Sequence, residues 1–181
     1  EKVTNIVLMG MREPFHNYNA TMEAIDRLSD PEGFGLGARR FTISTVGLVP
    51  MIKRFADENR QVNLAISLHE VKDIERSALM PVNKKYAIQE VIDACKYYVE
   101  KTHRRITFEW ALIAGKNDSE QTAQALAKLL KGLLCHVNAI PLNPTNQSIY
   151  QASSREQSLK FQKTLEKNGI PCTIFRLVVV N

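Results

Sequence analysis

The sequence lacks a long apolar run and has few cysteines. No hydrophobic stretch approaches the roughly 20 residues of a membrane-spanning helix, and we expect no signal peptide before Val3. We therefore expect a cytoplasmic protein that does not bind membranes. The three cysteines, Cys95, Cys135 and Cys172, are odd in number and far apart, which fits neither a disulfide framework nor a zinc site. Because Glu1 already adjoins a strand-like run, we expect the chain to be part of something longer.

The charge is only mildly unbalanced. The net charge of +5 is compatible with nucleic-acid binding, but a basic, solvated surface explains it equally well. Three clusters are candidates for RNA contact: Arg39 with Arg40, Lys84 with Lys85, and residues 103–105 (HRR). For the last cluster a solvated surface is the favoured interpretation. The length of 181 residues suits one compact domain over 1–181.

Strand-like and helix-like patterns alternate along the chain. We predict strands at 3–9, 41–46, 62–68, 106–113, 136–141 and 172–180, and helices at 20–28, 49–58, 88–99, 118–131 and 154–169. Asp118 is the expected cap of the fourth helix, and Ser154 that of the fifth. The cysteines are expected to be packing residues, with Cys95 on an apolar helix stripe. This alternation predicts an α/β fold with a parallel sheet, either doubly wound or a partial barrel.

Polar residues recur where the predicted strands end. Ligands of parallel βα folds bind at the carboxyl ends of the strands, where this chain offers Glu13, Ser44, Ser67, His69 and Asn143, with Glu109 inside a strand. Together they predict a pocket for a ligand that carries an amine, a carboxylate and hydroxyls. Singly, a serine there is more often a turn residue, and His69 is equally well a satisfied structural histidine. Glu13 instead pairs with Arg12 or another arginine if it binds no ligand.

Six motifs occur in an order that is specific to one enzyme family. The motifs are 9–14 (MGMREP), 33–36 (GFGL), 40–47 (RFTISTVG), 65–69 (AISLH), 80–86 (MPVNKKY) and 140–144 (IPLNP). On these motifs the chain resembles the radical-SAM adenine C2-methyltransferases of the RlmN/Cfr type from about Asn5 to Arg176. The resemblance implies a partial (β/α)6 TIM-like barrel that here lacks its first strand and cluster loop. It also implies methylation of adenine C2 in 23S ribosomal RNA and, in some members, transfer RNA.

The resemblance also implies cofactors and the residues that bind one of them. The family uses S-adenosylmethionine (SAM) and a [4Fe-4S] cluster, and a reductant protein supplies electrons to the cluster. Glu13 matches the acidic residue that binds the SAM ammonium, and Pro14 fixes the turn that aims it. Arg12, Ser44, Ser67, Leu68, His69 and Asn143 match the rest of the SAM site.

Three departures limit the resemblance. The family's Cys-x3-Cys-x2-Cys cluster motif is absent, and so is the segment before its methyl-carrying cysteine, so no cysteine is assigned to catalysis or to a metal. Arg12 stands where the family has glycine, and would clash with the ligand or compete for Glu13. We expect this chain alone to be inactive. The alternatives are an RNA-binding remnant, or another βα-barrel enzyme in which Glu13, Glu109 and His69 perform acid–base chemistry.

Overall fold

The computed structural model describes residues 3–9, 12–143 and 149–175. Its six strands are all parallel and lie in the sheet in chain order. They are β1 (Ile6–Leu8), β2 (Phe41–Thr45), β3 (Asn63–Ser67), β4 (Ile106–Leu112), β5 (Cys135–Pro141) and β6 (Cys172–Ile174). A doubly wound sheet reverses its strand order, whereas a barrel does not. The order therefore confirms the partial barrel and removes the doubly wound alternative.

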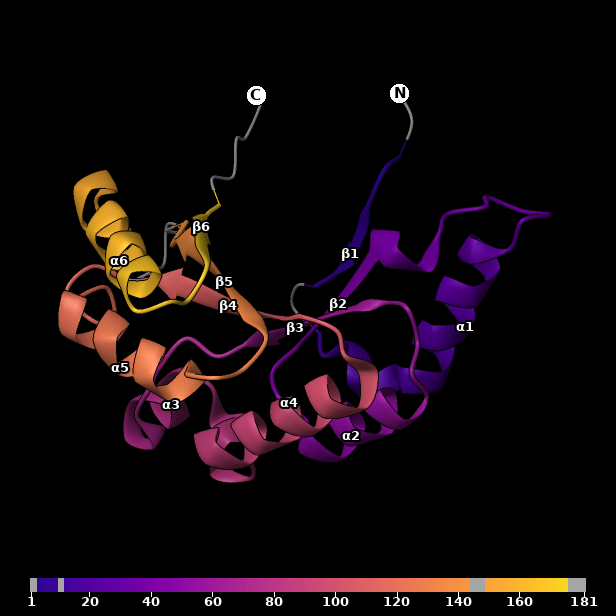
Figure 1. Ribbon diagram of the computed structural model, residues 1–181, viewed down its shortest axis with the longest axis horizontal. Helices are drawn as coiled ribbons and strands as arrows, with labels where there is room; N and C mark the ends of the chain where they lie inside the picture. The colour runs from indigo at the N-terminus through magenta and orange to yellow at the C-terminus, as the bar shows by residue number, and fades with distance from the viewer. Residues whose placement is uncertain (1–2, 10–11, 144–148, 176–181) are drawn as a thin grey trace.

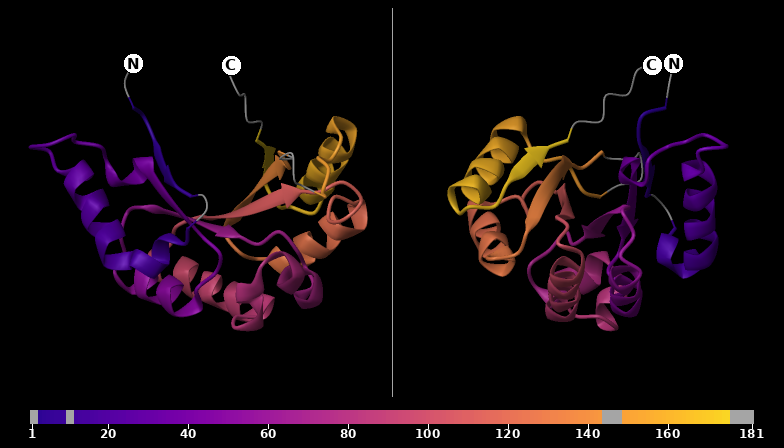
Figure 2. Two further views of the ribbon diagram at one scale, coloured as in Figure 1. Left: turned by 180° about the vertical axis from the view of Figure 1, so that it is seen from behind. Right: turned by 45° about the vertical axis from the view of Figure 1, so that its right-hand side comes forward.

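The helices cover the convex face of the curved sheet, as Figure 1 and both views of Figure 2 show. They are α1 (Tyr18–Ser29), α2 (Val49–Asp57), α3 (Asp73–Leu79), α4 (Ile88–Thr102), α5 (Glu120–Leu130) and α6 (Arg155–Lys167). Short 3-10 helices are η1 (Pro14–Asn17), η2 (Ala38–Arg40) and η3 (Pro81–Lys84). None of the helices in the described part of the chain is long and apolar enough to cross a membrane.

The core lies between the sheet and these helices. Side chains alternate between the faces of a strand, so Ile43, Ile66 and Phe108 are fully buried under the helices. Aromatic rings fill much of the layer, with Phe55 stacked on Tyr98 and Trp110 on Phe161. The register aligns the alternate, more polar positions across the sheet: Ser67 pairs with Glu109, and Glu109 with Asn138. Ser67, Glu109 and Asn138 thus make the concave face of the sheet polar, whereas the convex face, under the helices, is apolar.

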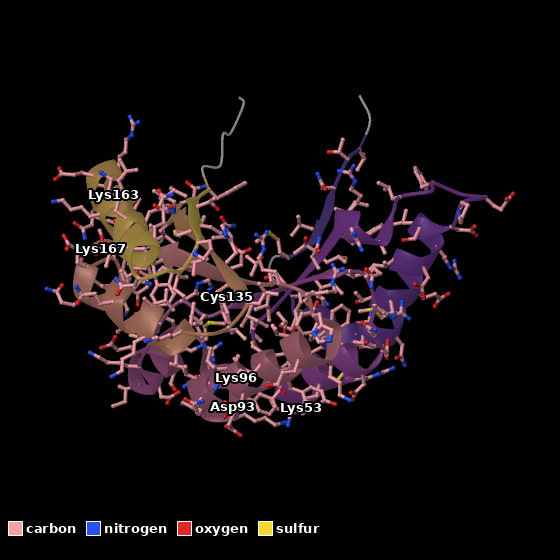
Figure 3. The ribbon with its side chains drawn as sticks, viewed as in Figure 1. Lys53, Asp93, Lys96, Cys135, Lys163 and Lys167 are labelled. Atoms are coloured by element: carbon pink, nitrogen blue, oxygen red, sulfur yellow. The ribbon has the colours of Figure 1, made fainter. Side chains whose placement is uncertain are left out.

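The cysteines are packing residues, as predicted. All three are buried, and Figure 3 places Cys135 inside the fold, in contrast to Lys163 and Lys167 at the periphery. Burial raises the pKa of the Cys135 thiol to about 11 and that of Cys172 to about 12. Thiols held in this way are poor metal ligands and poor nucleophiles at neutral pH.

The prediction for the start of α6 is confirmed, and that for α5 is wrong by one residue. Ser154 Oγ accepts a hydrogen bond from the Gln157 amide, at 3.1 Å, and caps α6. The cap of α5 is Ser119, whose Oγ accepts from the Thr122 amide at 3.1 Å. Asp118 is buried instead, and accepts hydrogen bonds from the Gly115 amide and from Ser153 Oγ. A carboxylate with tertiary partners leaves the capping role to the adjacent serine.

Two further predictions differ from the structure at the ends of the sheet and after β3. β1 and β6 are shorter than the predicted strands at 3–9 and 172–180, and positions 176–180 lie outside the described residues. The sequence did not predict α3. Its seven residues include a fully buried Arg76, so an apolar stripe of the kind that marks a helix is missing from the pattern.

Candidate functional site

An open cleft of about 1140 Å³ lies at the carboxyl ends of the strands. Five of the seven predicted SAM-site residues line it, together with Glu109: Arg12, Glu13, Ser44, Ser67 and His69. They come from the loop after β1, from β2 and from the end of β3. The predicted convergence of these strand ends is therefore present in the structure.

Glu13 is held by backbone groups on two sides. Its Oε1 accepts a hydrogen bond from the Phe15 amide at 3.0 Å, which caps η1. Its Oε2 accepts from the Val46 amide at 2.7 Å, which joins the loop after β1 to the end of β2. Within the described residues, Glu13 forms no ion pair with Arg12 or any other arginine. An ionised carboxylate offers about four acceptor positions, so two remain for a ligand cation.

The floor of the cleft carries hydroxyls and a buried carboxyl. Ser44 Oγ and Ser67 Oγ lie 3.5 Å apart on neighbouring strands. Glu109 is 8% exposed, and its Oε2 accepts from the Asn138 amide group at 3.0 Å. Burial raises the pKa of Glu109, an effect that the Asn138 hydrogen bond opposes. These groups can bind ligand hydroxyls.

His69 has a fixed hydrogen-bonding role. Its backbone is left-handed, with φ of 62°, and its carbonyl accepts from Asn117 Nδ2 at 2.8 Å. The ring Nδ1 accepts from the Ala111 amide at 3.0 Å, which places the proton of the neutral ring on Nε2. Burial and then the charge of Arg76 lower the pKa of His69 to about 4. At neutral pH His69 is therefore an uncharged donor, which disfavours the acid–base alternative.

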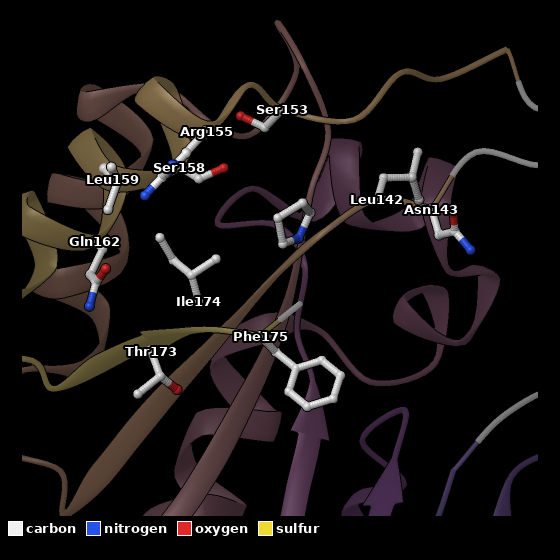
Figure 4. Close-up of a pocket in the computed structure, with 11 residues that line it drawn as sticks. Leu142, Asn143, Ser153, Arg155, Ser158, Leu159, Gln162, Thr173, Ile174 and Phe175 are labelled. Carbon is white, nitrogen blue, oxygen red and sulfur yellow. The ribbon is translucent and has the colours of Figure 1, made fainter. Parts of the chain in front are cut away.

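The other two predicted residues do not line this cleft. Leu68 is fully buried, as a residue that contributes only packing and backbone groups would be. Asn143 lines a neighbouring cavity of about 610 Å³. Figure 4 shows Asn143 and Leu142 at one end of this cavity, with Leu159 and Gln162 of α6 at the other. Gly10, three positions before Glu13 in the sequence, and Pro144, which follows Asn143, lie outside the described residues.

Two buried charged residues near the cleft are not among the predicted site residues, although Glu70 directly follows His69 at the end of the third predicted strand. Arg76 of α3 is fully buried and contacts the ends of β2 and β3. Glu70 is 1% exposed, and its Oε1 has no hydrogen-bond partner in the described part of the chain. Burial and the nearby Glu75 raise the pKa of Glu70 to about 7. Arginine and glutamate usually lie on surfaces, so residue type alone did not predict their burial.

The candidate RNA-contacting clusters lie in different parts of the fold. Arg39 and Arg104 both donate to Gln61 Oε1, at 3.2 and 3.0 Å, near the amino ends of β2–β4. This end of the sheet is opposite to the cleft. Lys85 follows η3, with its ammonium 5.4 Å from the Tyr86 ring centroid. The surface around Arg39 and Arg104 is therefore separate from the cleft.

Comparison with known proteins decides the family. The model of the radical SAM superfamily matches residues 1–130. The chain belongs to the radical SAM superfamily. It is 50% identical over 175 residues to a protein from Thermoanaerobacter sp. (strain X514) named "Probable dual-specificity RNA methyltransferase RlmN", covering 97% of this chain and 51% of the relative. The chain thus spans about half the length of the curated relatives it matches. The resemblance noted from the motifs is confirmed.

Solved structures agree with this assignment. A radical SAM methyltransferase from Sphaerobacter thermophilus superposes with a TM-score of 0.94 at 52% identity, over 97% of this chain and 51% of that chain. A domain of pyruvate-formate lyase-activating enzyme from Bacteroides vulgatus gives a TM-score of 0.70 at 17% identity, over 96% of this chain and 100% of that domain. The second likeness shows the fold alone, and both support the partial barrel.

The family's two cofactors fit these residues differently. Radical SAM enzymes use SAM and a [4Fe-4S] cluster. The cleft suits SAM, because the Glu13 carboxylate has acceptor positions left for an ammonium and Ser44 and Ser67 supply hydroxyls. The cluster does not fit: all three cysteines are buried, and the described residues hold no group of three or more metal-binding side chains. The described residues are thus suited to bind SAM without the cluster.

Proposed function

We propose that this chain is the SAM-binding core of an RNA methyltransferase that acts on C2 of adenine in 23S ribosomal RNA and in transfer RNA. The observation that carries the proposal is the cleft in which Glu13, Ser44, Ser67 and His69 converge. The name of the 50% identical relative supports RNA as the substrate. Adenine C2 is electron-poor and carries no acidic proton, so it needs the radical chemistry that this superfamily supplies when its cofactors are bound.

The chain's own residues bind and orient SAM. Glu13 binds the ammonium group with the acceptor positions that Phe15 and Val46 leave open. The His69 ring donates through Nε2 to a carboxylate or hydroxyl oxygen of the cofactor. Arg12 lines the same cleft without pairing with Glu13, and its long side chain weakens binding by clashing with the ligand. Arg39–Arg40 and Lys84–Lys85 contribute phosphate contacts, whose strength falls steeply with salt.

Calorimetry with SAM and the 181-residue chain tests the proposal. Glu13→Gln removes the negative charge and should weaken SAM binding about tenfold, which corresponds to a loss of ~1.4 kcal/mol of binding free energy. Arg12→Gly should strengthen SAM binding. Glu23→Gln is the matched control, because the Glu23 carboxylate lies on α1 and pairs with Arg27 outside the cleft. Absence of binding to the unmodified chain, or equal affinity in all variants, would refute the assigned site.

Methyl transfer tests the finer part of the proposal. The complete reading frame, reduced anaerobically with its reductant protein, should produce 2-methyladenine in 23S ribosomal RNA and transfer RNA, whereas this chain alone should produce none. Mass spectrometry of the nucleosides gives the answer. A methyl group at another position would contradict the choice of C2.

An inactive RNA-binding remnant is the second candidate. The observation that favours it is the burial of all three cysteines, which leaves no ligand set for a cluster in the described residues. RNA binding without SAM binding would support this candidate, and SAM binding that Glu13→Gln weakens would exclude it.

A further inference from the structure

Arg76 is a buried cation without a carboxylate partner in the described residues. Its side chain is fully buried, and its acceptors are three backbone carbonyls and one amide. Nε donates to Leu68 O at 3.0 Å, NH1 to Asn83 Oδ1 at 2.8 Å, and NH2 to Val46 O at 2.8 Å and Ser67 O at 3.0 Å. An apolar side chain would cost less to bury, so packing alone does not explain this arginine.

The guanidinium joins the two strand ends that carry the cleft residues. Val46 follows β2, Ser67 ends β3 and Leu68 follows it. Val46 also donates its amide to Glu13 Oε2. Glu13 and Arg76 therefore hold the same residue from opposite ends, one through its N–H and the other through its C=O. A change at Arg76 reaches Glu13 through two hydrogen bonds.

Arg76 also fixes the orientation of the His69 peptide. A trans peptide places its C=O and N–H on opposite sides, so the bond from Arg76 to Leu68 O turns the His69 N–H away from the guanidinium. Among the described residues, this N–H donates no hydrogen bond to a backbone carbonyl. Half-buried backbone donors usually have partners, and His69 has the left-handed backbone that often marks a functional site. The His69 N–H is thus suited to a ligand acceptor.

We propose that Arg76 is a positioning residue for SAM, which keeps the Glu13 carboxylate and the His69 amide in their binding positions without touching the cofactor. This inference rests on the proposed function. Arg76 needs its planar, forked guanidinium for the role, because a lysine ammonium cannot reach the same carbonyls in the same geometry.

Arg76→Lys tests the proposal because it keeps the charge and removes the fork. It should raise the SAM dissociation constant on the order of tenfold. Arg54→Lys is the matched control, since Arg54 also donates to two side chains, Glu58 and Asn19, but lies outside the cleft. Its affinity should equal that of the unmodified chain. A folded Arg76→Lys variant with unchanged affinity would overturn the proposal.

A ligand-free measurement separates this proposal from the proposed function. The amide NMR resonances of Val46, Leu68 and His69 should shift in Arg76→Lys, while those of α6 stay in place. Unshifted amides would overturn the positioning role even if the unmodified chain bound no SAM, a result that would by itself refute only the proposed function. If Arg76→Lys fails to fold, Asn83→Ala removes the acceptor of NH1 and should shift the same amides; unshifted amides in that folded variant would also overturn the proposal.

Discussion

Glu13→Ala should destabilise the ligand-free chain, because Glu13 joins two loops before any cofactor binds. Its two hydrogen bonds, at 3.0 Å to the Phe15 amide and 2.7 Å to the Val46 amide, would both be lost. Loss of the cap on η1 costs about 1 kcal/mol, and an unpaired, partly buried Val46 N–H costs about 1–3 kcal/mol. The free energy of unfolding should therefore fall by about 2–4 kcal/mol. Glu13→Gln keeps one acceptor oxygen and should lose about half as much.

Urea titration followed by circular dichroism measures this loss as a lower midpoint at unchanged slope. The melting temperature should fall by roughly 2–4 °C for each kcal/mol in a chain of this size. Glu23→Gln, which changes only an exposed pair on α1, should stay within about 0.5 kcal/mol of the unmodified chain. A Glu13→Ala midpoint equal to that of the unmodified chain would refute the structural role, and leave cofactor binding as the only function of this carboxylate.

Two further predictions concern stability near the cleft. Burial and Glu75 raise the folded pKa of Glu70 from 4.5 to about 7, so the folded chain binds more protons than the unfolded chain between these values, and stability falls as pH rises. Glu70→Gln should remove this part of the slope, measured as melting temperature from pH 4.5 to 7.5; parallel curves would contradict it. Gly47→Ala should cost at least about 1–2 kcal/mol, because φ is +101° and its Cβ would lie 3.0 Å from Val91 Cγ2; an unchanged urea midpoint would contradict this.

Periodicity predicted the parts of the fold where packing dominates. In α4, Ile88, Val91, Ile92, Cys95 and Tyr98 are all buried, as their spacing indicates. β4 and β5 were also predicted to within a residue or two. The pattern was less informative for α3, because Arg76 occupies a core position there. It also wrongly named Asp118 rather than Ser119 as a cap, because the outcome depends on Gly115 and Ser153, which contact Asp118 only in the folded chain.

The candidate site was predictable in composition but not in its contacts. Strand-end reasoning placed Glu13, Ser44, Ser67 and His69 at one edge of the sheet, where the cleft lies. It did not show that backbone amides hold Glu13, or that Asn143 faces a separate cavity. The assignment of these residues to SAM stays a prediction. Long-range hydrogen bonds such as that from Arg76 to Val46 join residues 30 positions apart, and no local pattern encodes them.

The order of the strands limits how copies of this molecule can associate. Over the described residues β1 and β6 each have a neighbour on one side only, so both present unpaired backbone groups. They run in the same direction, and joining β6 of one copy to β1 of the next would continue the parallel sheet without a two-fold axis. Such contacts do not close into pairs. Self-association would therefore produce oligomers of increasing length. One additional strand bound to β1 or β6 would block that edge and stop the growth.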